Sequence, residues 1–203
     1  MYYVPVTATL MIAALYDRQT LDRYIGKSSV GAYTFFYTIA NIVVAFPEAG
    51  VATVMSPRII AAYAANDLME YHRLMRQYLV RLNGSIVITG VAAIIAAKLA
   101  LKYFVREPIY HESLPVFYIL LIANALLTLS LWPHQSLYAR HHDTSVVAVS
   151  ILAVVPYIIL NLLMVPRVGI IGAAWANVAL QGFTLAGKLY LSVRIKGAGN
   201  RQS

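Results

Sequence analysis

The chain contains no cysteine among its 203 residues, and only 12% of its residues are charged. The absence of cysteine excludes disulfides, thiol catalysis and cysteine-ligated metals. The scarcity of charge is unusual, because about a quarter of the residues in a soluble domain are charged. With 60% hydrophobic residues and a mean hydropathy of +0.68, a soluble fold would lack the polar surface needed to cover itself. The composition therefore predicts an integral membrane protein.

Long stretches with few charges divide the chain into six segments that could cross a bilayer. A spanning helix needs about 17–25 mostly apolar residues. The predicted spans are approximately 2–25, 29–60, 82–104, 114–139, 144–165 and 170–192. We therefore expect an all-α polytopic membrane protein, with about six transmembrane helices forming one lobe over residues 1–193.

The pattern of these segments argues against three other kinds of protein. A transmembrane barrel would alternate polar and apolar residues, whereas these segments are continuous and rich in Leu, Ile and Ala. A secretory signal peptide would have a basic start and a small-residue cleavage site, and the first segment has neither. A net charge of +8 would suggest nucleic acid on a soluble protein. Here the basic residues lie between apolar blocks, which predicts contact with anionic membrane lipids and not with nucleic acid.

The predicted connections are short, except for residues 61–78. Asn66 and Asp67, followed by Glu70, are typical of a helix N-terminus. Apolar residues then recur near helical spacing, so we expect a short amphipathic helix on the membrane surface, leading into the third span. Residues 194–203 are polar and are predicted to form a disordered cytoplasmic tail.

The distribution of lysine and arginine predicts an orientation. If the chain crosses the membrane six times, nine of its 16 Lys and Arg residues fall on the side that holds both termini. The positive-inside rule assigns that side to the cytoplasm. Both termini are therefore predicted to be cytoplasmic.

Motifs in three regions resemble those of one protein family. Residues 14–60 contain a span ending in Asp-Arg, a short Gly-containing turn, VGAY at the start of the next span and Ser-Pro-Arg near its end. Residues 63–78 (YAANDLMEYHRLMRQY) are similar to the family's cytoplasmic joint, and residues 160–178 (LNLLMVPRVGIIGAAWANV) to its C-terminal signature. Their order and spacing resemble the polysaccharide biosynthesis proteins. These are Wzx-type flippases for O-antigen and other undecaprenyl-linked sugars, in the multidrug/oligosaccharidyl-lipid/polysaccharide exporter superfamily.

The resemblance has consequences for completeness and partners. Full-length family members have two six-helix lobes, and these spans resemble the second lobe. The chain would then be a C-terminal fragment, a truncated gene or a mis-called start, and two copies assembling together is the alternative. The implied partners are a lipid-linked oligosaccharide, membrane lipids, and the missing N-terminal lobe or a second copy. The implied location is the bacterial cell inner membrane.

The function implied by the resemblance is export of an undecaprenyl-pyrophosphate-linked oligosaccharide by alternating access. No P-loop is present, so an ion gradient or membrane potential would supply the energy, and no cofactor is expected. We do not expect an enzyme, because a membrane polymerase or ligase would need a large extracytoplasmic loop. An ion-coupled multidrug antiporter of the same superfamily and a non-transporting membrane subunit remain as alternatives.

Polar residues inside the spans are the candidates for a substrate cleft, because ionisable groups there are costly and usually functional. The predicted cleft residues are Arg18, Arg23, Asp17, Asp22, Glu48, Asn41 and His134. Arg18 and Arg23 are candidate phosphate contacts. The alternative is an interfacial ion-pair cluster in which Arg18 and Asp22, one helical turn apart, bind each other.

The remaining candidates also have two interpretations each. Glu48 follows Pro47, which can kink the helix and free a carbonyl. One interpretation of Glu48 is a coupling or gating group, and the other is a structural acid paired with an arginine of the first span. His134 is either a hydrogen-bonded packing residue or a proton-responsive group. Asn41 and the other mid-span asparagines are expected to form hydrogen bonds between helices. His141, His142 and Asp143 are interpreted as a solvated turn, so no metal site is predicted.

Overall fold

The computed structural model describes residues 3–140 and 142–199, with side chains placed over 11–140, 142 and 144–194. Every element in these residues is helical, which confirms the predicted fold class. The elements are α1 (Tyr3–Tyr24), α2 (Lys27–Ala40), α3 (Ile42–Pro47), a π-helical turn (Glu48–Ala52), α4 (Thr53–Ala64), α5 (Leu68–Tyr103), α6 (Pro108–Glu112), α7 (Leu114–Leu129), α8 (Leu131–Ala139), α9 (Asp143–Val168) and α10 (Ile170–Gly199).

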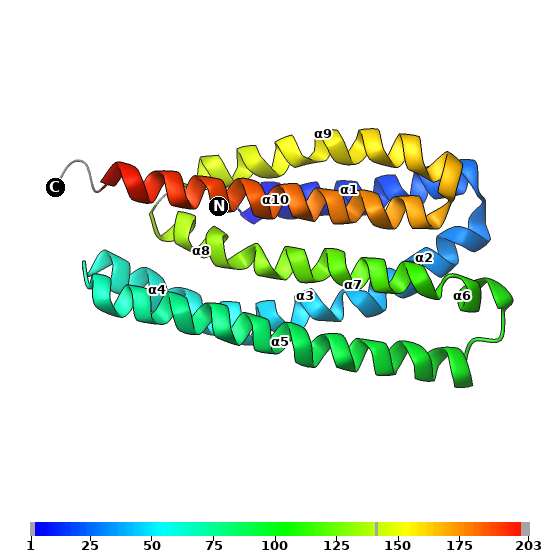
Figure 1. Ribbon diagram of the computed structural model, residues 1–203, viewed down its shortest axis with the longest axis horizontal. Coiled ribbons are helices and arrows are strands. Elements are labelled where there is room, and N and C mark those ends of the chain that lie inside the picture. The colour runs from blue at the N-terminus through cyan, green and yellow to red at the C-terminus, as the bar shows by residue number, and fades with distance from the viewer. Residues whose placement is uncertain (1–2, 141, 200–203) are drawn as a thin grey trace.

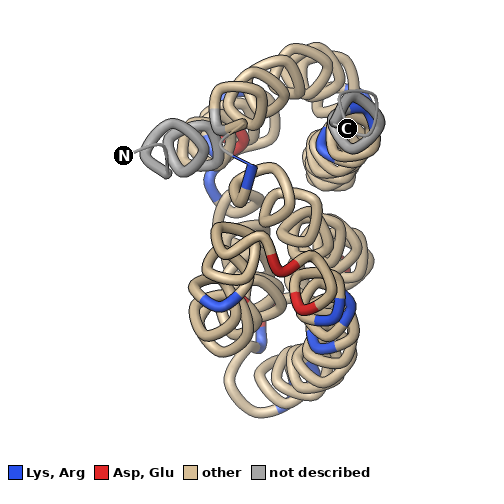
Figure 2. The backbone as a smooth tube through the Cα atoms, turned by 90° about the vertical axis from the view of Figure 1, so that its left-hand side faces the viewer, with Lys and Arg blue, Asp and Glu red and all other residues tan. Residues whose placement is uncertain are grey.

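The helices lie roughly parallel to one long axis (Figure 1). The α1–α2, α5–α7 and α9–α10 connections lie at one end of the bundle, and the α4–α5 connection lies at the other. α10 packs against α7 and α9, α1 packs against α9, and α5 packs against α3 and α4. Viewed end-on, the bundle has an elongated cross-section (Figure 2).

The outer faces of the bundle expose large apolar side chains. On α5 these are Val80, Val87, Ile88, Val91, Ile95 and Leu99. Soluble proteins rarely expose contiguous apolar patches of this kind, whereas lipid chains match them. Five helical stretches are long and apolar enough to cross a membrane: Lys27–Ala64, Leu68–Tyr103, Leu114–Ala139, Thr144–Val168 and Ile170–Arg194. The chain is therefore a polytopic α-helical membrane protein.

α1 is not one of these five stretches, although it has 22 residues. Two acidic and two basic residues fall in its second half and lower its hydropathy. It nevertheless packs beside α2 and α9 within the bundle. Five of the six predicted spans are thus long apolar helical stretches, and the sixth predicted span is a helix of mixed polarity.

The second span, Lys27–Ala64, is one helical stretch that is irregular beside its proline. Pro47 has no N–H to donate to the carbonyl of Val43, and the Thr128 hydroxyl of α7 donates to that carbonyl at 2.8 Å. The π-helical turn follows directly, and the Thr53 hydroxyl donates to the Glu48 carbonyl at 2.9 Å. Side-chain hydroxyls therefore bind backbone carbonyls on both sides of Pro47.

Residues 61–78 do not form a short helix of their own. α4 continues to Ala64, and α5 then runs without interruption for 36 residues. The predicted N-terminus is confirmed, because Asp67 Oδ1 accepts from the Glu70 N–H at 3.0 Å. The apolar face of this segment packs on α4 and α8 rather than on lipid headgroups, with Tyr71, Leu74, Met75 and Tyr78 buried. At 1.5 Å per residue, α5 is about 54 Å long and exceeds the roughly 30 Å hydrocarbon core.

Two tight connections depend on glycine. Gly26, between α1 and α2, has φ 104°, and Gly169, between α9 and α10, has φ 67°. Both values lie where a Cβ is disfavoured. α10 then continues to Gly199, so the predicted tail begins as helix, and residues 200–203 lie outside the described part of the chain.

Candidate functional site

A buried carboxylate, Asp17 of α1, joins four helices. Its side chain is 0% exposed. Its Oδ1 accepts from the Tyr157 hydroxyl at 2.7 Å and from Asn161 Nδ2 at 2.6 Å, both on α9. Its Oδ2 accepts from the Tyr33 hydroxyl of α2 at 2.8 Å and from Asn177 Nδ2 of α10 at 2.6 Å. These five residues are called the Asp17 cluster below. Burying a carboxylate costs several kcal/mol unless it is hydrogen-bonded, and here four donors surround it.

Local sequence explains how these donors converge. Tyr157 and Asn161 are four residues apart, so they lie on one face of α9. Asn177 follows a run of small residues that begins with Gly172. A Cβ at Gly172 would lie 2.6 Å from the carbonyl carbon of Met164. The small residues thus let α10 approach α9 closely enough for both amides to reach Asp17.

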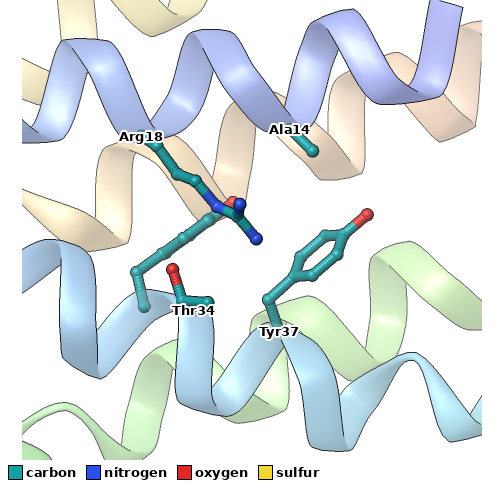
Figure 3. A pocket seen from close by; sticks show the side chains of 5 residues that line it. Ala14, Arg18, Thr34 and Tyr37 are labelled. Atoms are coloured by element: carbon teal, nitrogen blue, oxygen red, sulfur yellow. The ribbon is translucent and has the colours of Figure 1, made fainter. Parts of the chain in front are cut away.

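Arg18 follows Asp17 on α1, points to a different face of the helix and is exposed. Its side chain extends from α1 towards α2, near Thr34 and Tyr37, where it lines a narrow pocket (Figure 3). A wider depression of about 330 Å³ adjoins the α1–α2 turn and is lined by Arg18, Gln19, Asp22, Lys27 and Val30. Two cations and one carboxylate therefore share an accessible site at one end of the bundle.

The charged residues of the first span form no ion pair with one another in the described part of the chain. Arg18 and Asp22 form no ion pair with each other. The ion pair found among the described residues is Arg73–Glu70, at 2.7 Å. Arg23 is exposed and lies over the ring of Tyr24, 5.8 Å from its centroid. It does not line either pocket that Arg18 lines. The two predicted phosphate contacts therefore do not lie together.

Glu48 and His134, far apart in sequence, line one polar pocket of about 360 Å³. Its other lining residues include Ser56 of α4 with Gln135 and Tyr138 of α8. The Ser56 hydroxyl donates to Gln135 Oε1 at 2.9 Å, which ties α4 to α8. The His134 ring stacks on Tyr138 with their centroids 6.4 Å apart. Glu48 forms no ion pair with an arginine of α1 in the described residues, so its interpretation as a paired structural acid is wrong.

The asparagines divide into two groups. Asn161 and Asn177 form hydrogen bonds between helices, as expected. Asn41 is exposed at the α2–α3 junction and lines neither the Arg18 pockets nor the Glu48 pocket. The structure thus places the seven predicted cleft residues in five locations, and it brings together only Arg18 with Asp22 and Glu48 with His134.

Sequence reasoning missed several polar residues that the fold buries. Tyr33 and Tyr157 are two of 15 tyrosines, and nothing in their spacing distinguishes them from an aromatic belt. Lys188 lies inside the predicted sixth span but was not among the predicted cleft residues. It is only 2% exposed, and its Nζ donates to the Ser130 hydroxyl oxygen at 3.3 Å. The one available signal was the pair of asparagines in the middle of apolar spans.

In the part of the chain that the structure describes, no three His, Asp or Glu side chains lie close enough to hold a metal. His141 lies outside the described residues. No protein-family model matches the chain, and no curated protein or solved structure is significantly similar to it.

Proposed function

We propose that the chain is one lobe of a transporter that moves an undecaprenyl-pyrophosphate-linked oligosaccharide across the bacterial inner membrane by alternating access. A second lobe or a second copy of the chain would complete the cleft. Both termini would be cytoplasmic, in line with the excess of basic residues on their side.

The observation that carries this proposal is the π-helical turn within the second span. Single π-helical turns inside α-helices are rare and lie frequently at functional sites. Here Glu48 of the π-helical turn lines a polar pocket together with Ser56 and Gln135. Their carboxylate, hydroxyl and amide groups are suited to the hydroxyl groups of a glycan.

The depression lined by Arg18 supports the proposal that the substrate carries a pyrophosphate. Arg18 and Lys27 are both exposed and line the same depression. Cations placed in this way can form charge-assisted hydrogen bonds with phosphate oxygens. The exposed apolar faces of the bundle would allow the polyprenyl tail to remain in lipid.

The test uses the purified chain in liposomes. Translocation is followed with a fluorescent lipid-pyrophosphate-linked oligosaccharide, and binding is followed with undecaprenyl pyrophosphate alone. Arg18→Ala should weaken lipid-pyrophosphate binding about tenfold or more, because a hydrogen bond to a charged group contributes about 1.5–3 kcal/mol. Lys98→Ala is the matched control, since Lys98 is an exposed cation on α5 that lines neither Arg18 pocket.

Two results would overturn the proposal. One is a wild-type chain that neither binds the lipid pyrophosphate nor moves the oligosaccharide. The other is an Arg18→Ala variant that matches the Lys98→Ala control in both measurements. Efflux of cationic drugs in place of the oligosaccharide would support the antiporter alternative.

A further inference from the structure

The hydroxyl of Tyr157 lies between two acceptors. It is 2.7 Å from Asp17 Oδ1 and also 2.7 Å from the carbonyl oxygen of Ala13. A tyrosine hydroxyl has a single hydrogen but can also accept a hydrogen bond. Tyr157 can therefore donate to only one of these two oxygens at a time.

This geometry accommodates two protonation states of Asp17. When Asp17 is ionised, Tyr157 donates to Oδ1. When a proton binds Oδ1, the new O–H can donate to the Tyr157 oxygen, and Tyr157 turns its own hydrogen to the Ala13 carbonyl. The only covalent bond that forms or breaks is the O–H bond of the bound proton. Both states keep this contact satisfied.

A stripe of buried polar residues leads away from this cluster along α10. Asn177, Gln181, Thr184 and Lys188 are all buried and recur every three or four residues, so they share one face of the helix. The stripe is about 16 Å long at 1.5 Å per residue. At its far end, Lys188 Nζ donates to the Ser130 hydroxyl, and the Ser130 carbonyl accepts from the backbone N–H of His134 at 3.1 Å. His134 in turn lines the polar Glu48 pocket.

Two atoms along this route are buried and make no hydrogen bond with any described residue: Asn161 Oδ1 and Gln181 Oε1. Buried polar atoms are nearly always hydrogen-bonded, to protein or to ordered water. Asn161 belongs to the Asp17 cluster, and Gln181 lies one helical turn beyond Asn177. Both atoms are acceptors that water can satisfy.

We propose that Asp17 is a reversible proton-binding site, and that the polar stripe of α10 is a hydrated pathway connecting it to the Glu48 pocket. Tyr157 acts as the switch between the two protonation states. The titratable groups around the site are Tyr33 and Tyr37 from α2, Tyr157 from α9 and Tyr16 from α1, and at the far end Lys188 and His134. The proposal goes beyond the transported solute and can be tested without any oligosaccharide.

The experiment uses the full chain in lipid nanodiscs and infrared difference spectroscopy during a pH titration. Protonation of Asp17 should give a carboxylic-acid carbonyl band that is reversible and absent in Asp17→Asn. Tyr157→Phe should shift the frequency of that band, because the partner of the acid O–H is removed. After a rapid pH jump, Gln181→Leu should slow the appearance of the band severalfold without moving the midpoint of the titration.

Gln77→Leu is the matched control, because Gln77 is an exposed glutamine on α5, and it should leave both band and rate unchanged. A residue that only stabilises the fold would not change the rate selectively in a variant that remains folded by circular dichroism. The proposal is overturned if no Asp17 band appears at any pH at which the chain stays folded. It is also overturned if the band forms in Gln181→Leu as fast as in the wild type.

Discussion

Replacing Asp17 by alanine should strongly destabilise the bundle, because it removes the acceptor shared by four donors. Two of these donors have another acceptor. Tyr157 can donate to the Ala13 carbonyl, and Asn177 Nδ2 also contacts the Ala173 carbonyl at 3.2 Å. The Tyr33 hydroxyl and Asn161 Nδ2 have no second acceptor among the described residues and would be left buried and unpaired.

An orphaned buried donor costs about 1–3 kcal/mol, so the two together predict a loss of about 2–6 kcal/mol in the free energy of unfolding. Asp17→Asn should cost less, because an asparagine carbonyl oxygen can still accept from Tyr157 and Asn161. Asp22→Ala is the matched control: it removes a carboxylate from the same helix, but from an exposed position.

The measurement is reversible unfolding in mixed micelles, with increasing mole fraction of sodium dodecyl sulfate and helix content followed by circular dichroism. Asp17→Ala should be the most destabilised variant and Asp17→Asn should be less so, while Asp22→Ala should unfold close to the wild type. If Asp17→Ala unfolds at the same detergent fraction as Asp22→Ala, the Asp17 cluster does not hold the four helices together and the reasoning fails.

Three further substitutions test separate parts of the fold by the same unfolding measurement. Gly172→Ala should lower the free energy of unfolding by about 1–3 kcal/mol, because the added Cβ meets the backbone of Met164. Gly182→Ala is the matched control: its Cβ would lie in open space, so the change should be neutral or stabilising. Equal effects of the two substitutions would contradict the close α9–α10 contact. Asp67→Ala should cost about 1 kcal/mol through loss of the α5 N-cap, and unchanged stability would show that the cap contributes nothing. Lys188→Met should be neutral or stabilising, because it replaces a buried cation by an apolar side chain of similar length; a large loss would mean that Lys188 has a stronger partner than Ser130.

The sequence correctly predicted features that depend on neighbouring residues. The apolar blocks predicted membrane helices, Pro47 predicted a freed carbonyl, and Asp67 with Glu70 predicted a helix start. Each of these depends on backbone chemistry within a few residues, so no tertiary contact was needed to infer it.

Errors arose where a side chain's role depends on a distant helix. The amphipathic face after Asp67 was assigned to lipid headgroups, but the same apolar spacing suits packing on α4 and α8. Arg18 and Asp22 have the spacing of a helical ion pair, yet Arg18 instead extends towards α2. Lys188 was not predicted as a buried polar residue, because sequence alone cannot tell which face of α10 is buried.

The amino-acid sequence by itself therefore determined that the chain is an all-α membrane protein, because hydropathy and proline chemistry act locally along the chain. Tertiary structure decided which polar groups meet. Asp17, Tyr33, Tyr157, Asn161 and Asn177 come from four helices and span 160 positions in sequence. They converge because Gly172 and its small neighbours let α9 and α10 approach, and burial then forces each donor to find an acceptor.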